Sequence, residues 1–177
     1  AMDILVSSNL ERLLFDLYNE DSNELAQLMN ELNTKGKYTV SPIVKEKLNQ
    51  LFAAGFATEN EVEDEINRIF IADQYTLDPH TAVASFVTKK YQENSLDQTP
   101  TVIVSTASPY KFPETVFHAL TGKEVKEKGV PAIKELNSFL QEDLSGNVNN
   151  LIQTGNYQEQ IIKASEMENT LLNILDI

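Results

Sequence analysis

The chain contains no cysteine and no tryptophan, and only two of its 177 residues are histidine. Without cysteine it can form no disulfide, no thiolate metal site and no cysteine nucleophile. Two histidines do not favour a histidine-based metal site, so we expect no bound metal. Basic residues are scarce, because 14 Lys and Arg stand against 27 Asp and Glu, a formal net charge of −13. Such a surface repels phosphate groups, so neither nucleic acid nor an anionic membrane is an expected partner.

Long apolar runs are also missing. No stretch approaches the ~20 apolar residues that span a bilayer, and the N-terminus lacks the basic and then apolar order of a signal peptide. We therefore expect a cytoplasmic protein. Ala1 before Met2 resembles a remnant of cloning, which predicts a natural chain beginning at or before Met2. Hydrophobic residues make up 41% of the chain, which is enough for a packed core.

Most of the chain has the residue spacing of amphipathic helices. Most of the helix start signals are a capping side chain followed by Glu or Pro at the expected distance, and the others are a capping side chain or a proline alone. The helix stop signals are single glycines. The start signals are Ser8 with Glu11, Asp21 with Ser22, Ser41 with Pro42, Thr58 with Glu61, Asp78 with Pro79, Pro113 and Pro131, and the stop signals are Gly36, Gly55 and Gly122. This pattern predicts about six to eight helices.

The same pattern suggests a division of the chain. We expect residues 1–142 to form the main body. Residues 143–155 are rich in Asn, Gly and Ser, which predicts a linker. Residues 156–177 have the apolar spacing of one amphipathic helix that begins near Tyr157.

One stretch differs from the helices around it. Residues 101–105, bracketed by Pro100, are a β-branched run without charge, which predicts a strand buried on both faces as in a parallel sheet. Residues 56–58 could form at most a second, short strand beside residues 101–105. The predicted class is therefore α/β, dominated by helices, with one clear core strand.

A lone buried strand needs neighbours, because each orphaned backbone group costs about 1–3 kcal/mol. This mismatch suggests that the chain is a fragment whose remaining strands lie elsewhere. We expect the isolated piece either to pair this strand with a second copy or to leave it as an exposed edge, and so to self-associate through it.

Three stretches carry a resemblance to a known family. They are Met2-Asp3-Ile4 with Ser8-Asn9-Leu10-Glu11-Arg12-Leu13, then Tyr75-Thr76-Leu77-Asp78-Pro79-His80-Thr81-Ala82-Val83, then Ser105-Thr106-Ala107 with Pro109, Lys111 and Phe112. In order and spacing they resemble the C-terminal part of threonine synthases of the bacterial and fungal type, from Met2 to about Gly122. The resemblance implies a fold-type-II pyridoxal phosphate enzyme that converts O-phosphohomoserine and water into threonine and phosphate, a carbon–oxygen lyase acting on phosphate.

The same resemblance implies that essential parts are absent. In the family the Schiff-base lysine and the glycine-rich loop that holds the cofactor phosphate lie upstream of the matched stretches. The six glycines of this chain are scattered, so no phosphate-binding nest is expected. We therefore expect this C-terminal fragment to bind no cofactor and to be inactive by itself.

The resemblance also suggests cofactor-binding residues. It implies that Thr106 offers its hydroxyl to the pyridine nitrogen of the cofactor, with Ser105 as a weaker neighbour that shares the contact. The structural alternative is a strand-end Thr that bonds nearby backbone. Ser108 stands where the family commonly has His, which removes one potential acid or base.

Three further residues are candidates for the pocket. The resemblance brings the helix start at Asp78 and His80 toward the cofactor or substrate. Capping of the helix explains Asp78 equally well, and His80 fits a pocket wall and a structural role equally. Lys111 could contact the substrate phosphate, although a solvated loop lysine is the simpler interpretation.

Other functions remain open. The main rival is a stand-alone acidic helical interaction module without a catalytic role. A related threonine dehydratase or cysteine synthase would share the hydroxyl at the strand end but not the Asp-Pro-His-Thr-Ala-Val run. Upstream sequence with a cofactor-binding lysine would favour the enzyme over the module.

Overall fold

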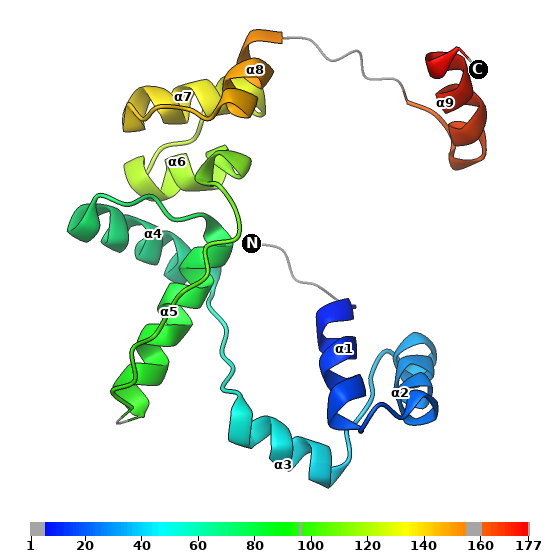
Figure 1. The fold of residues 1–177 in the computed structure, drawn as a ribbon. Coiled ribbons are helices and arrows are strands. Elements are labelled where there is room, and N and C mark those ends of the chain that lie inside the picture. The colour runs from blue at the N-terminus through cyan, green and yellow to red at the C-terminus, as the bar shows by residue number, and fades with distance from the viewer. Residues whose placement is uncertain (1–5, 96, 155–160, 177) are drawn as a thin grey trace.

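The computed structural model describes residues 6–95, 97–154 and 161–176, and their regular structure is entirely helical (Figure 1). The α-helices are α1 Ser8–Leu17, α2 Ser22–Lys35, α3 Pro42–Leu51, α4 Glu59–Asp73, α5 Pro79–Asn94, α6 Pro113–Thr121, α7 Val130–Leu140, α8 Gly146–Thr154 and α9 Met167–Leu175, and two short 3-10 helices are η1 Pro109–Lys111 and η2 Ala164–Glu166. Helix dominance is thus confirmed. None of the helices in these ranges is long and apolar enough to cross a membrane.

Helices α1 to α3 form a first unit with its own small core. Its buried residues are Leu14, Leu17, Leu28 and Val44. The unit is closed by polar contacts between helix ends, because the Ser41 backbone N–H donates to the Tyr18 hydroxyl at 2.9 Å and Lys47 Nζ donates to the Leu17 carbonyl at 3.1 Å.

The helix starts confirm most of the predicted caps. Asp21, Ser41, Thr58 and Asp78 are N-caps whose side chains accept backbone N–H groups, and Gly36 and Gly122 end α2 and α6 with positive φ. Two expectations need correction. Ser7, not Ser8, caps α1 and accepts from the Leu10 N–H at 3.3 Å, because adjacent serines offer equal hydroxyls. Helix α3 ends at Leu51, before Gly55.

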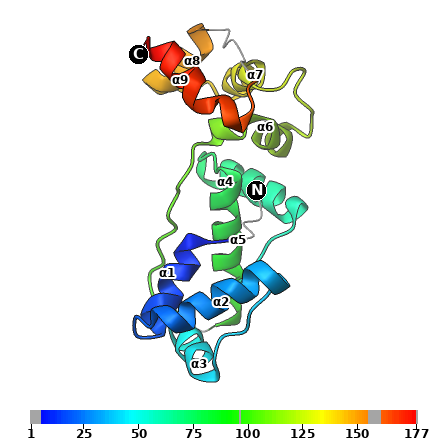
Figure 2. The same ribbon diagram turned by 90° about the vertical axis from the view of Figure 1, so that its right-hand side faces the viewer.

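Helices α4 to α7 form a second unit. Helix α4 packs on both α5 and α6, and α7 packs on α6. The buried core is Val62, Ile66, Leu77, Ala82, Val116, Phe117 and Leu136. Figure 2 shows α4, α6 and α7 above the group of α1, α2 and α3, with α5 extending down behind that group. Residues 52–57 join the two, and a Cβ added at Gly55 would lie 2.8 Å from Val87 Cγ1, so this connection crosses α5 closely.

A buried carboxylate links α4 to α5. Glu65 is only 3% exposed. Arg68 donates to both carboxylate oxygens at 2.7 and 2.6 Å, and the Ser85 hydroxyl on α5 donates to Oε1. Burial alone would raise the pKa of Glu65, but the hydrogen bonds from Arg68 and Ser85 outweigh it and lower the pKa below its ordinary value.

This carboxylate should make the second unit sensitive to acid. Because the pKa of Glu65 is lower in the folded state, the unfolded state binds more protons than the folded state in acid. The carboxylate therefore stabilises the fold above pH ~4.3, the ordinary pKa of Glu, and this stabilisation is lost as the pH falls further. We expect the free energy of unfolding to drop between pH 6 and pH 3. In Glu65→Gln the drop should be smaller, and in Ser85→Ala intermediate. Urea unfolding at the two pH values measures this, and an equal drop in Glu65→Gln would contradict it.

Residues 101–105 do not form the expected buried strand. They lie outside any helix or strand, with Val102 85% and Val104 71% exposed, and the companion at residues 56–58 is not a strand either. The correction has a simple reason, because a strand is buried only by partner strands and the described ranges of this chain supply none. The stretch runs along α5 as an exposed segment, from Gln92 to Thr81, and pairing with a second copy stays a prediction.

The C-terminal region also differs from expectation. The stretch predicted as a linker contains α8, because Leu144, Val148, Leu151 and Ile152 share helical spacing and the helix packs on α7. The predicted helix start at Tyr157 lies outside the described residues. Residues 161–163 are not helical, and α9 begins at Met167.

Candidate functional site

The candidate site lies at the N-terminal end of α5, where two of the matched motifs meet. Asp78 caps this helix and is 1% exposed. Its Oδ1 accepts the N–H groups of His80 at 2.9 Å and Thr81 at 3.3 Å. The carboxylate thus accepts backbone N–H groups that have no partner within the helix, and its negative charge lies at the positive end of the helix dipole. Because it is buried and fully engaged, Asp78 positions its neighbours here.

Thr81 connects this cap to the second motif. Its Oγ1 contacts Asp78 Oδ2 in a short hydrogen bond and lies 3.3 Å from Ser105 Oγ. An ionised carboxylate can only accept, so the Thr81 hydroxyl donates to Asp78. The Ser105 hydroxyl must then donate to Thr81. This chain of three side chains fixes Ser105 at the start of α5, and it places the backbone of Thr106 next to it.

His80 makes a second link between the motifs. Its ring packs against Phe112 with centroids 5.0 Å apart, and its Nδ1 lies 3.4 Å from Asp78 Oδ1. The imidazole is 39% exposed. One face of the His80 ring is therefore packed, and the residue also borders a cavity.

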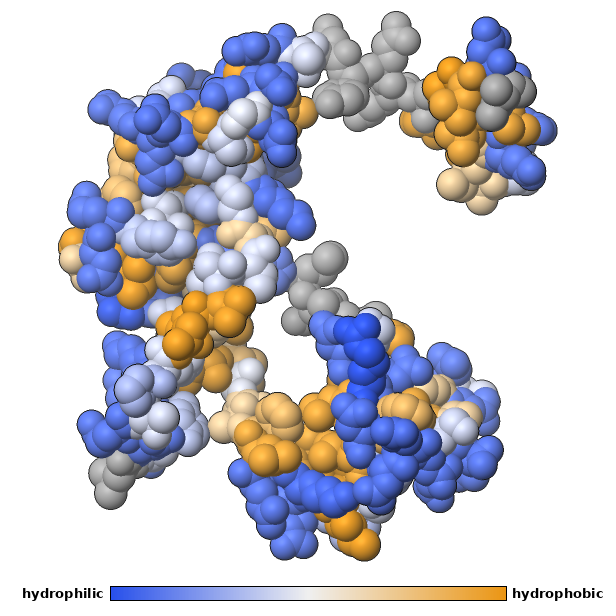
Figure 3. All heavy atoms as spheres, in the orientation of Figure 1, coloured by the Kyte–Doolittle hydropathy of each residue, from blue (hydrophilic) through white to orange (hydrophobic). Residues whose placement is uncertain are grey.

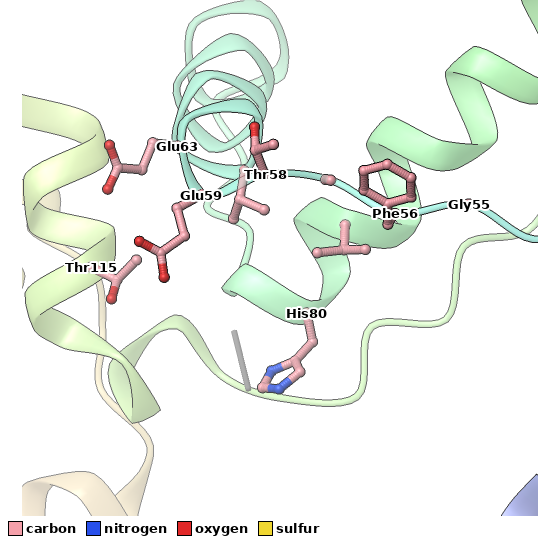
Figure 4. Close-up of a pocket in the computed structure, with 10 residues that line it drawn as sticks. Gly55, Phe56, Thr58, Glu59, Glu63, His80 and Thr115 are labelled. Carbon is pink, nitrogen blue, oxygen red and sulfur yellow. The ribbon is translucent and has the colours of Figure 1, made fainter. Parts of the chain in front are cut away.

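The cavity beside His80 has a volume of about 530 Å3 and lies between α4, α5 and α6. Figure 4 shows Glu59 and Glu63 on α4 pointing toward Thr115 on α6, with His80 farther along the hollow. Two carboxylates and no lysine or arginine in its lining make this cavity unsuited to a phosphate. It can accept hydrogen-bond donors or a cation.

Thr106 and Lys111 are placed differently from the residues above. Thr106 is exposed and makes no hydrogen bond within the described part of the chain, so its hydroxyl is available. Lys111 is exposed too, and its Nζ lies 5.8 Å from the centre of the Phe112 ring. Each of the twelve lysines in the sequence lies in the described ranges, and none is buried.

Three residues that build the site were not predicted from the sequence. Thr81 is the central link, and a signal for it existed, because a hydroxyl three residues after an N-cap Asp can turn back to it. Phe112 was matched only as part of a motif. Thr115 faces the cavity from α6, and no local pattern indicates this.

Comparisons with known proteins agree with these motifs. Residues 81–145 match the family described as threonine synthase, C-terminal. The chain is 35% identical over 139 residues to threonine synthase-like 1 of Macaca fascicularis, covering 78% of this chain and 18% of that protein. It is 39% identical over 132 residues to threonine synthase of Schizosaccharomyces pombe, covering 68% of this chain and 26% of that protein. The chain thus spans about a fifth to a quarter of the length of these relatives.

Two solved structures resemble the whole arrangement. Yeast threonine synthase matches with a TM-score of 0.72 and 26% identity, covering 99% of this chain and 35% of that chain. A threonine synthase from Brucella melitensis with bound pyridoxal phosphate matches with a TM-score of 0.59 and 30% identity, covering 86% and 32%. These matches place the chain in the threonine synthase family, as a segment that corresponds to the C-terminal part of its members.

Proposed function

We propose that this chain forms part of a pyridoxal phosphate-dependent threonine synthase that converts O-phosphohomoserine and water into threonine and phosphate, a carbon–oxygen lyase acting on phosphate. The observation that carries the proposal is the hydrogen-bonded chain of Ser105, Thr81 and Asp78. This chain of hydrogen bonds joins two motifs through residues that lie 24 positions apart in the sequence. Thr106 follows Ser105 directly, and its hydroxyl makes no hydrogen bond within the described residues. The pyridoxal phosphate in the Brucella relative supports the same cofactor here.

The residues present fit one end of this cofactor. The exposed hydroxyl of Thr106 is a suitable donor to a pyridine nitrogen, and Ser105 beside it is held by Thr81. Among the residues that the structure describes, the phosphate end of the cofactor finds no binding loop, because the glycines with positive φ, Gly36, Gly122 and Gly129, lie at separate helix ends. This chain would therefore supply the ring-nitrogen contact, and the lysine and phosphate contacts would come from other parts of the protein.

Each residue then has a defined task. Bound pyridoxal phosphate supplies an electron sink for bond cleavage next to the amino group of the substrate. Thr106 holds the ring with a neutral hydroxyl and provides no carboxylate to keep its nitrogen protonated. Asp78 and Thr81 would fix the turn that bears Thr106, and His80, packed against Phe112, would form a wall of the cofactor pocket. Lys111, exposed near Phe112, is the one candidate for a substrate-phosphate contact among the predicted residues.

The exposed segment 101–105 is proposed to be a strand in the intact enzyme. Gln92 Nε2 donates to Thr101 Oγ1 at 3.2 Å, and Thr81 meets Ser105. The eleven helical steps between Thr81 and Gln92 span ~16 Å, while four residues cover at most ~14 Å. A segment close to full extension, with the contacting side chains covering the remaining distance, meets both contacts, and this is the conformation that a strand requires. Residues 56–58, on the connection that crosses α5, are proposed as its short companion.

A direct test compares the chain with the intact protein that contains it. We expect the 177-residue chain to bind no pyridoxal phosphate and to release no phosphate from O-phosphohomoserine. The intact protein should do both, measured by cofactor absorbance after gel filtration and by phosphate release. An intact protein that binds no cofactor would contradict the proposal and would favour the non-catalytic interaction module. Cytoplasmic location and self-association through residues 101–105 stay predictions.

A further inference from the structure

The chain exposes more surface than a compact protein of its size. Its accessible surface is 13462 Å2, whereas a compact monomer of 19.9 kDa exposes ~8,700 Å2. The difference of ~4,800 Å2 exceeds the ~1,000–2,500 Å2 that one partner contributes to an obligate interface, about half of the ~2,000–5,000 Å2 total. Many large apolar side chains contribute to it, so a substantial part of this surface is suited to burial.

Helix α9 is the clearest case. Its apolar side chains Met167, Leu171, Ile174 and Leu175 are 61%, 56%, 69% and 55% exposed. Three of them, Met167, Leu171 and Ile174, line an apolar groove together with Ile162. The opposite side carries Asn169 and Asn173. The helix is therefore amphipathic, with an apolar face that has no cover in the described part of the chain.

Nothing in the described residues holds α9 in place. Its substantial contacts are with η2 alone. Figure 1 shows α9 standing apart from α7 and α8, and Figure 3 shows apolar atoms gathered on it. Yet the superposition on yeast threonine synthase extends over 99% of this chain, so it includes α9. The matched residues make up 35% of that yeast polypeptide, so most of its chain lies outside the match.

These observations identify the occupant. We propose that the apolar face of α9, formed by Met167, Leu171 and Ile174, docks onto the part of its own polypeptide that lies outside these 177 residues. The proposal rests on the proposed function, since it requires a longer parent protein. The rest of the same polypeptide is favoured over a second copy, because most of the relative's chain lies outside the match and is joined covalently to it. With a net charge of −13 on this chain, the surface that receives α9 should be apolar with a basic rim.

The test uses the intact parent protein and amide hydrogen exchange read by mass spectrometry. Amides of residues 167–175 should exchange more slowly than in a random coil. Leu171→Asp should speed their exchange by about 10- to 100-fold, the equilibrium factor for burying one Leu side chain. Asn173→Asp adds the same charge on the opposite side and should stay close to wild type. If the Leu171→Asp variant does not fold, the milder Leu171→Ala variant replaces it in the same measurement and should also speed the exchange of the α9 amides.

Three results would overturn the proposal. The first is exchange of the α9 amides at the random-coil rate in the wild-type protein, and the second is equal protection of these amides in the Leu171 and Asn173 variants. The third is protection that increases with protein concentration while a larger assembly forms, because this would identify a second copy as the cover of α9. Phosphate release by the same wild-type sample is read separately. A protein that protects α9 but releases no phosphate would refute the enzyme and leave the docking intact.

Discussion

Replacing Leu14 with alanine should unfold α1, α2 and α3 while α4 to α7 remain folded. Leu14 is 1% exposed in the first core, and the loss of such a side chain costs about 2–5 kcal/mol. The first unit spans residues 8–51, and units of this size are marginally stable. The two cores share no residue, so the cost should fall on the first unit alone.

Hydrogen exchange on the 177-residue chain measures this effect helix by helix. Leu136→Ala is the matched variant, since Leu136 is 0% exposed in the second core. It should remove protection from α4, α5, α6 and α7 and spare α1 to α3. Loss of protection in all helices at once, in either variant, would show that the chain unfolds as one cooperative unit and would contradict the prediction.

The helices were predictable because their signals are local. The cap at Asp21 and the capping box of Thr58 with Glu61 need only residues within one turn. The same applies to Gly36, whose φ of 70° ends α2. Where the local signal was ambiguous, the prediction from the sequence differed from the structure. The Asn- and Gly-rich composition of α8 suggested a linker, but its apolar spacing and the neighbouring α7 outweighed that composition.

Features that depend on distant partners were not predictable in this way. Residues 101–105 have the composition of a strand, but composition cannot supply neighbouring strands, and the segment is exposed. The candidate site shows the same limit. Asp78 and Ser105 were predicted from the sequence, yet their connection through Thr81 depends on how the segment runs along α5. Residue types were therefore predictable, whereas their arrangement required the fold.

That arrangement leads to a prediction about the cofactor. In the intact protein, Thr106→Val keeps the shape of the side chain and removes its hydroxyl. A buried polar group that loses its partner costs about 1–3 kcal/mol, so pyridoxal phosphate should bind about 5- to 150-fold more weakly. Titration of the cofactor-free protein, followed by cofactor absorbance, gives the affinity.

Two further variants separate direct contact from positioning. Ser108→Ala removes a hydroxyl two residues away that accepts the Tyr110 N–H at 3.3 Å, and it should leave the affinity nearly unchanged. Thr81→Val breaks the link between Asp78 and Ser105, so Thr106 would keep its hydroxyl but lose its fixed position. Its loss of affinity should therefore lie between those of the other two variants. If Thr106→Val bound the cofactor as tightly as Ser108→Ala, the hydroxyl of Thr106 would not contact the ring, and the position proposed for this chain in the cofactor site would be wrong.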